Sequence, residues 1–129
     1  MTLDPKKAKN LAKLTPEELD ALANNKTERP FSGRLLYNDK QGTYRCRACD
    51  QKLFLSINKI NTGTGWPSFN KEIPGSILKS EDNSYGMHRI ALNCSNCGAH
   101  LGHLFNYGSS IKPKLEYCIN SISLDFKEV

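Results

Sequence analysis

Cys46-Arg-Ala-Cys49 and Cys94-Ser-Asn-Cys97 are two identically spaced cysteine pairs, and they decide how this chain folds. A Cys-x-x-Cys turn lets two thiolates converge, and two such turns complete a tetrahedral four-thiolate site for zinc. Four sulfur ligands leave no position for water, so this metal would stabilise the fold and take no part in hydrolysis. We expect one structural Zn²⁺ per chain, the alternative being reduced core thiols or redox disulfides. Its ligands would be Cys46, Cys49, Cys94 and Cys97.

The residues around the two turns indicate a chain rich in β-structure. Glycine and proline recur from Thr27 onward far too often for long helices. Helical signals are confined to the N-terminal part, where Thr15-Pro-Glu-Glu18 combines a capping threonine, a proline at the first helical position and a capping-box glutamate. We predict a mainly β fold of antiparallel sheets pinned by zinc, with a short helical N-terminal arm over residues 1–26. The expected strands are 34–37, 42–46, 52–56, 76–79, 89–93 and 114–126.

Length and composition are typical of a single domain spanning residues 1–129. Hydrophobic residues make up 38% of the chain and charged residues 24%, which suits one core. No apolar run approaches the roughly 18 residues of a membrane helix, and the first residues lack the apolar region of a signal peptide. Two Cys-x-x-Cys pairs and one odd thiol suit a reducing compartment better than a framework of disulfides. We therefore expect a cytoplasmic monomer that does not bind membranes. We also expect no binding to nucleic acid. The net charge is +5, but no basic stripe interleaved with aromatic residues accompanies it.

Cys118 is the one cysteine that remains once the other four are paired. Its neighbours are β-forming residues, and the alternation of a strand would place Glu116, Cys118 and Asn120 on one face. A lone cysteine in a strand is most often a small buried hydrophobe. A reactive thiol is the alternative.

Two further segments carry residue types suited to a reactive site. His100 and His103 follow the second cysteine turn. One could be a core residue and the other a surface residue, or both could bind metal. In a third interpretation they orient a substrate and donate a proton near neutral pH. With a free thiol downstream, a Cys–His site becomes a candidate. Trp66, the only tryptophan, lies in the glycine-rich loop 63–69. Such a residue either packs in the core or forms the rigid wall of an apolar pocket.

Taken in order, these motifs resemble the methionine-R-sulfoxide reductases of the B type, from about residue 14 to residue 126. The motifs that carry the resemblance are Thr27-Glu-Arg-Pro-Phe-Ser-Gly33, both Cys-x-x-Cys turns, Gly63-x-Gly-Trp-Pro-Ser-Phe69, Gly86-Met-x-Arg89, His100-Leu-Gly-His103-x-Phe105 and Tyr117-Cys-Ile-Asn-Ser121. The resemblance implies two antiparallel sheets and a structural zinc distant from the active site. It also implies repair of oxidised proteins under oxidative stress, by reduction of methionine-R-sulfoxide, protein-bound or free.

The resemblance also implies roles for single residues. Cys118 matches the nucleophile and Trp66 the wall that receives the substrate's ε-methyl group. The polar groups around the sulfoxide would be His100, His103 and Asn120, and Phe105 and Glu116 are expected to contact the substrate. A thiolate attacks the sulfoxide sulfur, the oxygen is protonated, methionine leaves, and the cysteine becomes a sulfenic acid that another thiol must reduce.

Several positions depart from the family pattern. Many members carry the reducing cysteine where this chain has Thr64, so we expect an external thiol, from thioredoxin, a glutaredoxin or glutathione. Glu116 replaces the usual arginine, and a carboxylate there would raise the pKa of the thiol unless Lys112 or Lys114 compensates. Tyr107 and Ala91 replace acidic residues. These departures favour a second hypothesis, a non-catalytic binding module that uses the Trp66 pocket.

Overall fold

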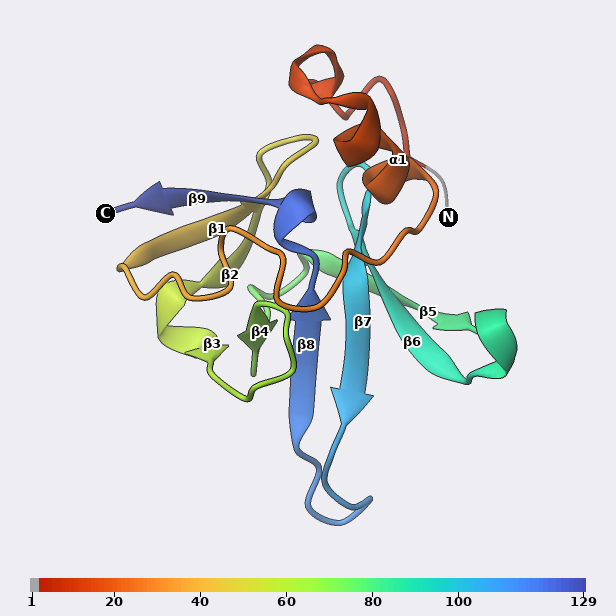
Figure 1. Ribbon diagram of the computed structural model, residues 1–129, viewed down its shortest axis with the longest axis vertical. Helices are drawn as coiled ribbons and strands as arrows, with labels where there is room; N and C mark the ends of the chain where they lie inside the picture. The colour runs from red at the N-terminus through yellow and green to blue at the C-terminus, as the bar shows by residue number, and fades with distance from the viewer. Residues whose placement is uncertain (1–2) are drawn as a thin grey trace.

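The computed structural model describes residues 3–129 and is built from two antiparallel sheets, as predicted (Figure 1). The smaller sheet has the order β2 (Lys52–Leu55), β1 (Gly42–Cys46), β9 (Leu124–Glu128). The larger has the order β3 (Lys59–Ile60), β4 (Ser68–Phe69), β8 (Leu115–Ile119), β7 (His100–Asn106), β6 (Arg89–Cys94), β5 (Ile77–Asp82). One α-helix, α1 (Pro16–Ala23), and four 3₁₀ turns complete the described part: η1 (Leu11–Lys13), η2 (Ser56–Asn58), η3 (Ser84–Gly86) and η4 (Ser121–Ser123).

Aromatic side chains from both sheets form the centre of the core. Phe54 of β2 stacks on Phe69 of β4 with ring centroids 4.2 Å apart, and Tyr44 of β1 meets Phe69 edge-on at 5.0 Å. Tyr117 of β8 contacts Phe54 from the other side at 5.8 Å. All four side chains are buried, so the face of β8 that carries Tyr117 is anchored in the core and the opposite face is available for other contacts.

The two cysteine turns have the same backbone design and belong to different sheets. The first follows β1 and the second follows β6. Asp50 and Gly98, each directly after the second cysteine of its turn, have φ of 69° and 80°, the left-handed conformation that glycine adopts freely and aspartate tolerates. Their amides donate to the carbonyls of Cys46 and Cys94 at 2.8 and 2.9 Å. Whatever the four thiols bind therefore ties one sheet to the other.

The N-terminal arm packs against these turns. The predicted capping box is present: Thr15 Oγ1 accepts from the Glu18 amide at 3.1 Å, and the Glu18 carboxylate accepts from the Thr15 amide at 2.9 Å. Further upstream, the Asp4 amide donates to the carbonyl of Cys97 at 2.7 Å, and the Asn10 amide donates into the first cysteine turn. The arm thus covers the cysteine turns, with η1 and α1 as its helical elements.

Two predictions of elements were wrong, and one long strand was missed. Residues 34–37 form consecutive turns, because the amide of Leu36 donates to the carbonyl of Gly33, three residues earlier, and not to a neighbouring strand. The predicted strand 114–126 is broken by η4 into β8 and β9, which belong to different sheets. The strand β7 was not predicted at all, since Gly102 and two histidines weaken its strand signal.

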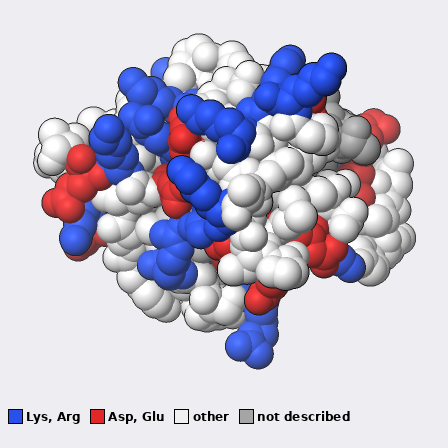
Figure 2. Space-filling model, turned by 90° about the horizontal axis from the view of Figure 1, so that it is seen from above, with Lys and Arg blue, Asp and Glu red and all other residues white. Residues whose placement is uncertain are grey.

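Charged side chains of both signs are distributed over the surface. Figure 2 looks onto the α1 end, where Lys and Arg lie scattered with Asp and Glu among them. Within residues 3–129, none of the helices has the length and apolar character needed to cross a membrane.

Candidate active site

Cys118 lies in the middle of β8, between two polar residues on the neighbouring strands. It pairs with Ser68 of β4 on one side and with His103 of β7 on the other, so the three side chains form a row on one face of the sheet. The Ser68 hydroxyl lies 3.7 Å from the Cys118 sulfur, and the Thr64 hydroxyl lies 3.0 Å from that of Ser68. The thiol is 6% exposed, so it is accessible only through a narrow opening.

The pKa of Cys118 is raised above its ordinary value. Burial is the main cause, because removal from water disfavours the thiolate. The hydroxyls of Ser68 and Thr64 lower the pKa, and the Glu116 carboxylate raises it again. The thiol therefore rests mainly in its protonated form near neutral pH.

Glu116 is a buried carboxylate on the same face of β8 as Cys118. It is 3% exposed and lies directly opposite Phe105 of β7. Among residues 3–129 its side chain has no ion-pair partner, and the two lysines expected to compensate, Lys112 and Lys114, are exposed. Its negative charge acts on Cys118 without a neighbouring cation to offset it.

His103 belongs to a charged network that ends on β5. Its Nε2 is 2.8 Å from Asp82 Oδ2, and Arg89 Nη2 is 3.2 Å from the same oxygen. Hydrogen bonds from Ser84 and His103 hold the pKa of Asp82 well below its usual range. Burial lowers the pKa of His103, and the Asp82 carboxylate opposes that shift. The imidazole is thus neutral near pH 7 and has a carboxylate that stabilises its protonated form.

His100 lies beneath His103 and away from the pocket. The two rings meet edge-on with centroids 5.3 Å apart, and His100 is 1% exposed. Neither of its ring nitrogens has a hydrogen-bond partner in the described structure, and burial lowers its pKa to about 4. It is therefore a neutral packing partner of His103.

A pocket of about 40 Å³ opens onto the Cys118 thiol. Of the residues predicted from the sequence, it brings together Trp66, His103, Phe105, Cys118 and Asn120. Thr27, Arg89 and Gly102 complete the wall. His100 and Glu116 do not line it. The strand alternation that was expected to include Asn120 ends at Ile119, and Asn120 reaches the pocket from the start of η4.

The wall opposite His103 is held by the segment Lys26–Glu28. Asn120 Nδ2 donates to the Lys26 carbonyl at 2.8 Å, and its Oδ1 accepts from the Glu28 amide at 3.1 Å. The Glu28 carbonyl in turn accepts from Trp66 Nε1 at 2.9 Å. Asn120 thus positions the tryptophan as well as lining the pocket.

Sequence reasoning missed the contributions of Asp82 and Ser68. Ala91 lies opposite His103 in the sheet and carries no carboxylate, and Asp82 supplies one from the next strand. The signal available for Asp82 was weak, since it is one of two adjacent acidic residues at a strand end. Ser68 belongs to the Trp-Pro-Ser motif, but only the pairing of β4 with β8 places it against the thiol.

The four remaining cysteines form a buried cluster whose dimensions suit a metal. Their sulfur atoms all lie within 4.8 Å of one another, with Cys46–Cys97 and Cys49–Cys94 separations of 3.7 and 3.6 Å. Zinc–sulfur bonds of about 2.3 Å in a tetrahedron require sulfur atoms roughly 3.8 Å apart. Gln51 Nε2 approaches Cys94 at 3.4 Å, the kind of outer contact that orients a thiolate ligand.

Comparison with known proteins agrees with this arrangement. The SelR domain model matches residues 14–128, and the chain belongs to that family. Within it, the similarity is to methionine-R-sulfoxide reductases of the B type. Relatives named peptide methionine sulfoxide reductase MsrB from Methanosarcina barkeri and Methanosarcina mazei are each 52% identical, over 88% of this chain and 80% and 81% of their own lengths. One from Agrobacterium fabrum is 44% identical over 90% of this chain and 86% of its own.

Proposed function

We propose that this protein reduces methionine-R-sulfoxide to methionine, with Cys118 as the nucleophile. The observation that carries the proposal is a lone thiol that lines one pocket together with Trp66 and with His103, whose ring is hydrogen-bonded to Asp82. Membership of the SelR family and the names of its relatives support the same activity. The cysteine content suits a reducing compartment, which agrees with repair of oxidised proteins in the cytoplasm.

In the proposed reaction, Trp66 and Phe105 receive the ε-methyl group and leave the sulfoxide sulfur above Cys118. The thiolate forms a bond to that sulfur, and the sulfoxide oxygen gains negative charge. His103 takes the proton that the Cys118 thiol releases, Asp82 stabilises the resulting imidazolium, and His103 then passes this proton to the oxygen. The hydroxyl then moves from the substrate sulfur to the Cys118 sulfur as the bond between the two sulfur atoms breaks, so that thiol and sulfoxide become sulfenic acid and thioether.

Regeneration requires a thiol from outside the chain. Thr64 lies next to Ser68 beside the nucleophile, where a cysteine would be close enough to attack. The other four cysteines are gathered in the buried cluster. An external thiolate therefore attacks the sulfenic sulfur, releases water and leaves a mixed disulfide, which a second thiol cleaves. Thioredoxin, a glutaredoxin or glutathione supplies this chemistry.

We also propose that Cys46, Cys49, Cys94 and Cys97 hold one structural Zn²⁺. When bound, the ion saturates its four positions with sulfur and supplies cohesion between the sheets. The catalytic residues act without it.

The decisive experiment compares the separated R and S epimers of methionine sulfoxide in an assay driven by dithiothreitol. We expect turnover of the R epimer only, and its loss in Cys118→Ser. Mass spectrometry after a single turnover without reductant should find one added oxygen on Cys118. No turnover of the R epimer by the wild type would instead favour the non-catalytic binding module, equal turnover in wild type and Cys118→Ser would exclude Cys118 as the nucleophile, and an intramolecular disulfide would refute the external-thiol scheme.

A further inference from the structure

Two hydroxyl groups lie beside Cys118 on the flank opposite His103. Ser68 Oγ is 3.7 Å from the Cys118 sulfur, and Thr64 Oγ1 is 3.0 Å from Ser68 Oγ. Ser68 is 1% exposed, and neither hydroxyl residue lines the pocket that opens onto the sulfur. The sulfur therefore has the pocket and His103 on one flank and a pair of hydroxyls on the other. Reduction of the sulfoxide, as proposed, uses only the first flank.

The two hydroxyls form a chain that leads from solvent to the sulfur. Thr64 is half-buried, and Thr62, two residues earlier in the same loop, is exposed. Thr64 Oγ1 accepts from the Trp66 amide at 3.4 Å, which leaves the Thr64 proton available to Ser68. Ser68 can donate to Cys118 or to the Trp66 carbonyl, which is 3.0 Å away. Because a hydroxyl rotates to suit its acceptor, Ser68 can turn from that carbonyl toward an oxygen bound to the sulfur.

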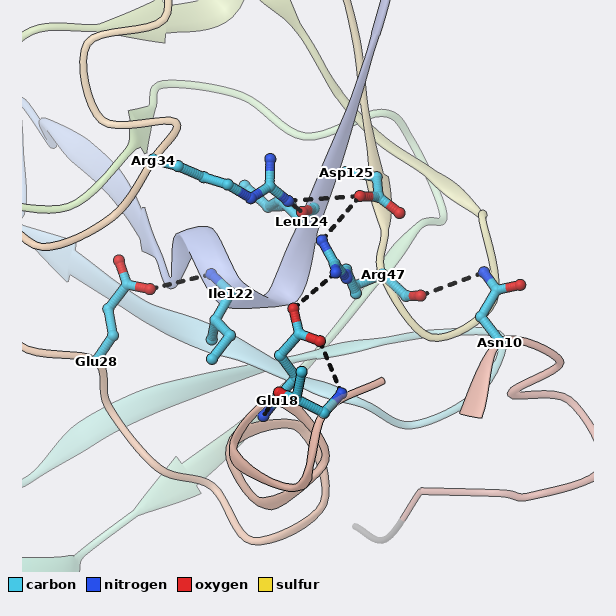
Figure 3. Close-up of polar contacts among 9 residues, drawn as sticks. Asn10, Glu18, Glu28, Arg34, Arg47, Ile122, Leu124 and Asp125 are labelled. Atoms are coloured by element: carbon cyan, nitrogen blue, oxygen red, sulfur yellow. Dashed lines mark hydrogen bonds and ion pairs between the residues drawn. The ribbon is translucent and has the colours of Figure 1, made fainter. Parts of the chain in front are cut away.

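The loop that carries Thr64 is anchored to a segment distant in sequence. Trp66 Nε1 donates to the Glu28 carbonyl at 2.9 Å. The Glu28 carboxylate in turn accepts from the Ile122 amide at 3.0 Å, which ties this segment to η4 (Figure 3). Thr64 lies two residues before the anchored tryptophan, so its hydroxyl is held against Ser68 before any ligand arrives. The hydroxyl chain is therefore preorganised, which is the property that a proton donor in a reactive site needs.

The return of the sulfenic acid to a thiol calls for a proton donor on this second flank. A thiolate displaces the hydroxyl of a sulfenic acid along the line of the bond that breaks, so the attacking and departing groups lie on opposite sides of the sulfur. An external thiol reaches Cys118 through the pocket beside His103. The departing oxygen then points toward the other flank, where Ser68 lies. Hydroxide is a poor leaving group, so a proton delivered there accelerates the step.

We propose that Ser68 and Thr64 form a proton relay for the regeneration of Cys118. The inference rests on the proposed function, because it takes the sulfenic acid and the external thiol from that scheme. The thiolate forms a disulfide bond to the Cys118 sulfur as the sulfur–oxygen bond breaks, and the electron pair of that bond leaves with the oxygen. Ser68 donates a proton to the oxygen, which departs as water, and Thr64 replaces the proton with one from solvent. The two half-reactions thus use opposite flanks of the sulfur, His103 serving the first and Ser68 the second.

The test measures the two half-reactions separately. Each protein is converted to the Cys118 sulfenic acid with methionine-R-sulfoxide, and the methionine formed is recorded. The oxidised protein is then freed of excess substrate and mixed with dithiothreitol, and mass spectrometry of acid-quenched samples follows the loss of the added oxygen. We expect Thr64→Val and Ser68→Ala to lower the second-order rate constant of this second step about tenfold or more. The Cys118 thiol is absent during the step, so a changed pKa of that thiol cannot cause the loss.

Two matched variants isolate the hydroxyl group. Thr64→Ser keeps the hydroxyl at the same position and should regenerate at close to the wild-type rate. Thr62→Val makes the same change as Thr64→Val at an exposed threonine of the same loop, and it should leave the rate unaltered.

The outcomes separate the relay from the activity. Equal regeneration rates in the wild type, Thr64→Val and Ser68→Ala, with any loss confined to the formation of methionine, would overturn the relay while the reductase function stands. A loss in Thr64→Ser or Thr62→Val as large as that in Thr64→Val would also overturn it, because the shape of the loop and not the hydroxyl would then be responsible. If the wild type formed neither methionine nor a sulfenic acid, the proposed function would fail and the relay with it.

Discussion

Glu116 is the residue that most distinguishes the reactivity of this thiol. Its carboxylate raises the pKa of Cys118, which burial already raises, and no cation among the described residues offsets it. We predict that Glu116→Gln lowers the Cys118 pKa and that Glu116→Arg lowers it further. The thiolate fraction at neutral pH, and with it the alkylation rate, should rise accordingly.

The measurement is alkylation rate or thiolate absorbance against pH, with Cys118→Ser as the blank for the four clustered cysteines. Glu128→Gln, an exposed change of the same kind at the end of β9, is the control. An unchanged or higher Cys118 pKa in Glu116→Arg would contradict the electrostatic role given to this residue.

His100 makes stability depend on pH. Its pKa falls from 6.5 to about 4 in the folded protein because the ring is buried without hydrogen-bond partners. Below pH 6.5 the unfolded chain binds a proton that the folded protein does not, so stability falls as pH drops toward 4. The full effect is at most about 3 kcal/mol.

We predict that His100→Phe weakens this pH dependence, because phenylalanine fills the site and does not titrate. Since neither nitrogen is hydrogen-bonded, the substitution should cost little at pH 7. Denaturant unfolding of both proteins at pH 7 and pH 5 provides the check, and the effect of acid on the cysteine cluster cancels in the comparison. Identical losses in the two proteins would show that His100 is not the group responsible.

At the scale of elements, the start of η4 and the segment Lys26–Glu28 act together. Asn120 holds this segment, and the segment holds Trp66 through the Glu28 carbonyl. We predict that Asn120→Ala lowers kcat/KM by about tenfold or more, because two hydrogen bonds of about 1 kcal/mol each are lost and the wall loosens. The single tryptophan should emit at longer wavelength as water reaches it.

Fluorescence and steady-state kinetics measured on the same samples test this coupling. Asn61→Ala, at an exposed asparagine in a loop, should change neither. Lower activity with an unshifted Trp66 emission would mean that Asn120 acts on the substrate directly and not through the wall.

Elements with local sequence signals could be predicted, whereas the pairings between distant strands could not. The capping box at Thr15 and the strand that ends at Cys46 were predicted because their signals are local. The pairing of Cys118 with His103 was not, since it depends on β7, whose glycine and histidines hide its strand character. Asp82 was missed for a related reason: it reaches His103 from across the sheet, at a distance in sequence that no local pattern records.

For the whole molecule, the cysteine cluster is a second contact between the two sheets, besides the aromatic core. We predict that Cys46→Ser releases the bound zinc and lowers the melting temperature by several degrees or more, because a three-ligand site loses most of its binding energy. Metal analysis of the purified protein and thermal denaturation measure the two effects. Cys118→Ser, a change of the same type outside the cluster, should keep both zinc and melting temperature. Full zinc content in Cys46→Ser would contradict the assignment.

The N-terminal arm gives the cluster a further property, which concerns rates of metal exchange. Asp4 and Asn10 bond to the backbone of the two cysteine turns, and Ala8 between them is 2% exposed. A chelator can therefore reach the sulfur atoms from this side only after the first residues have detached. For the zinc proposed above, the lifetime of the ion would therefore depend on how often residues 4–10 detach as well as on equilibrium affinity.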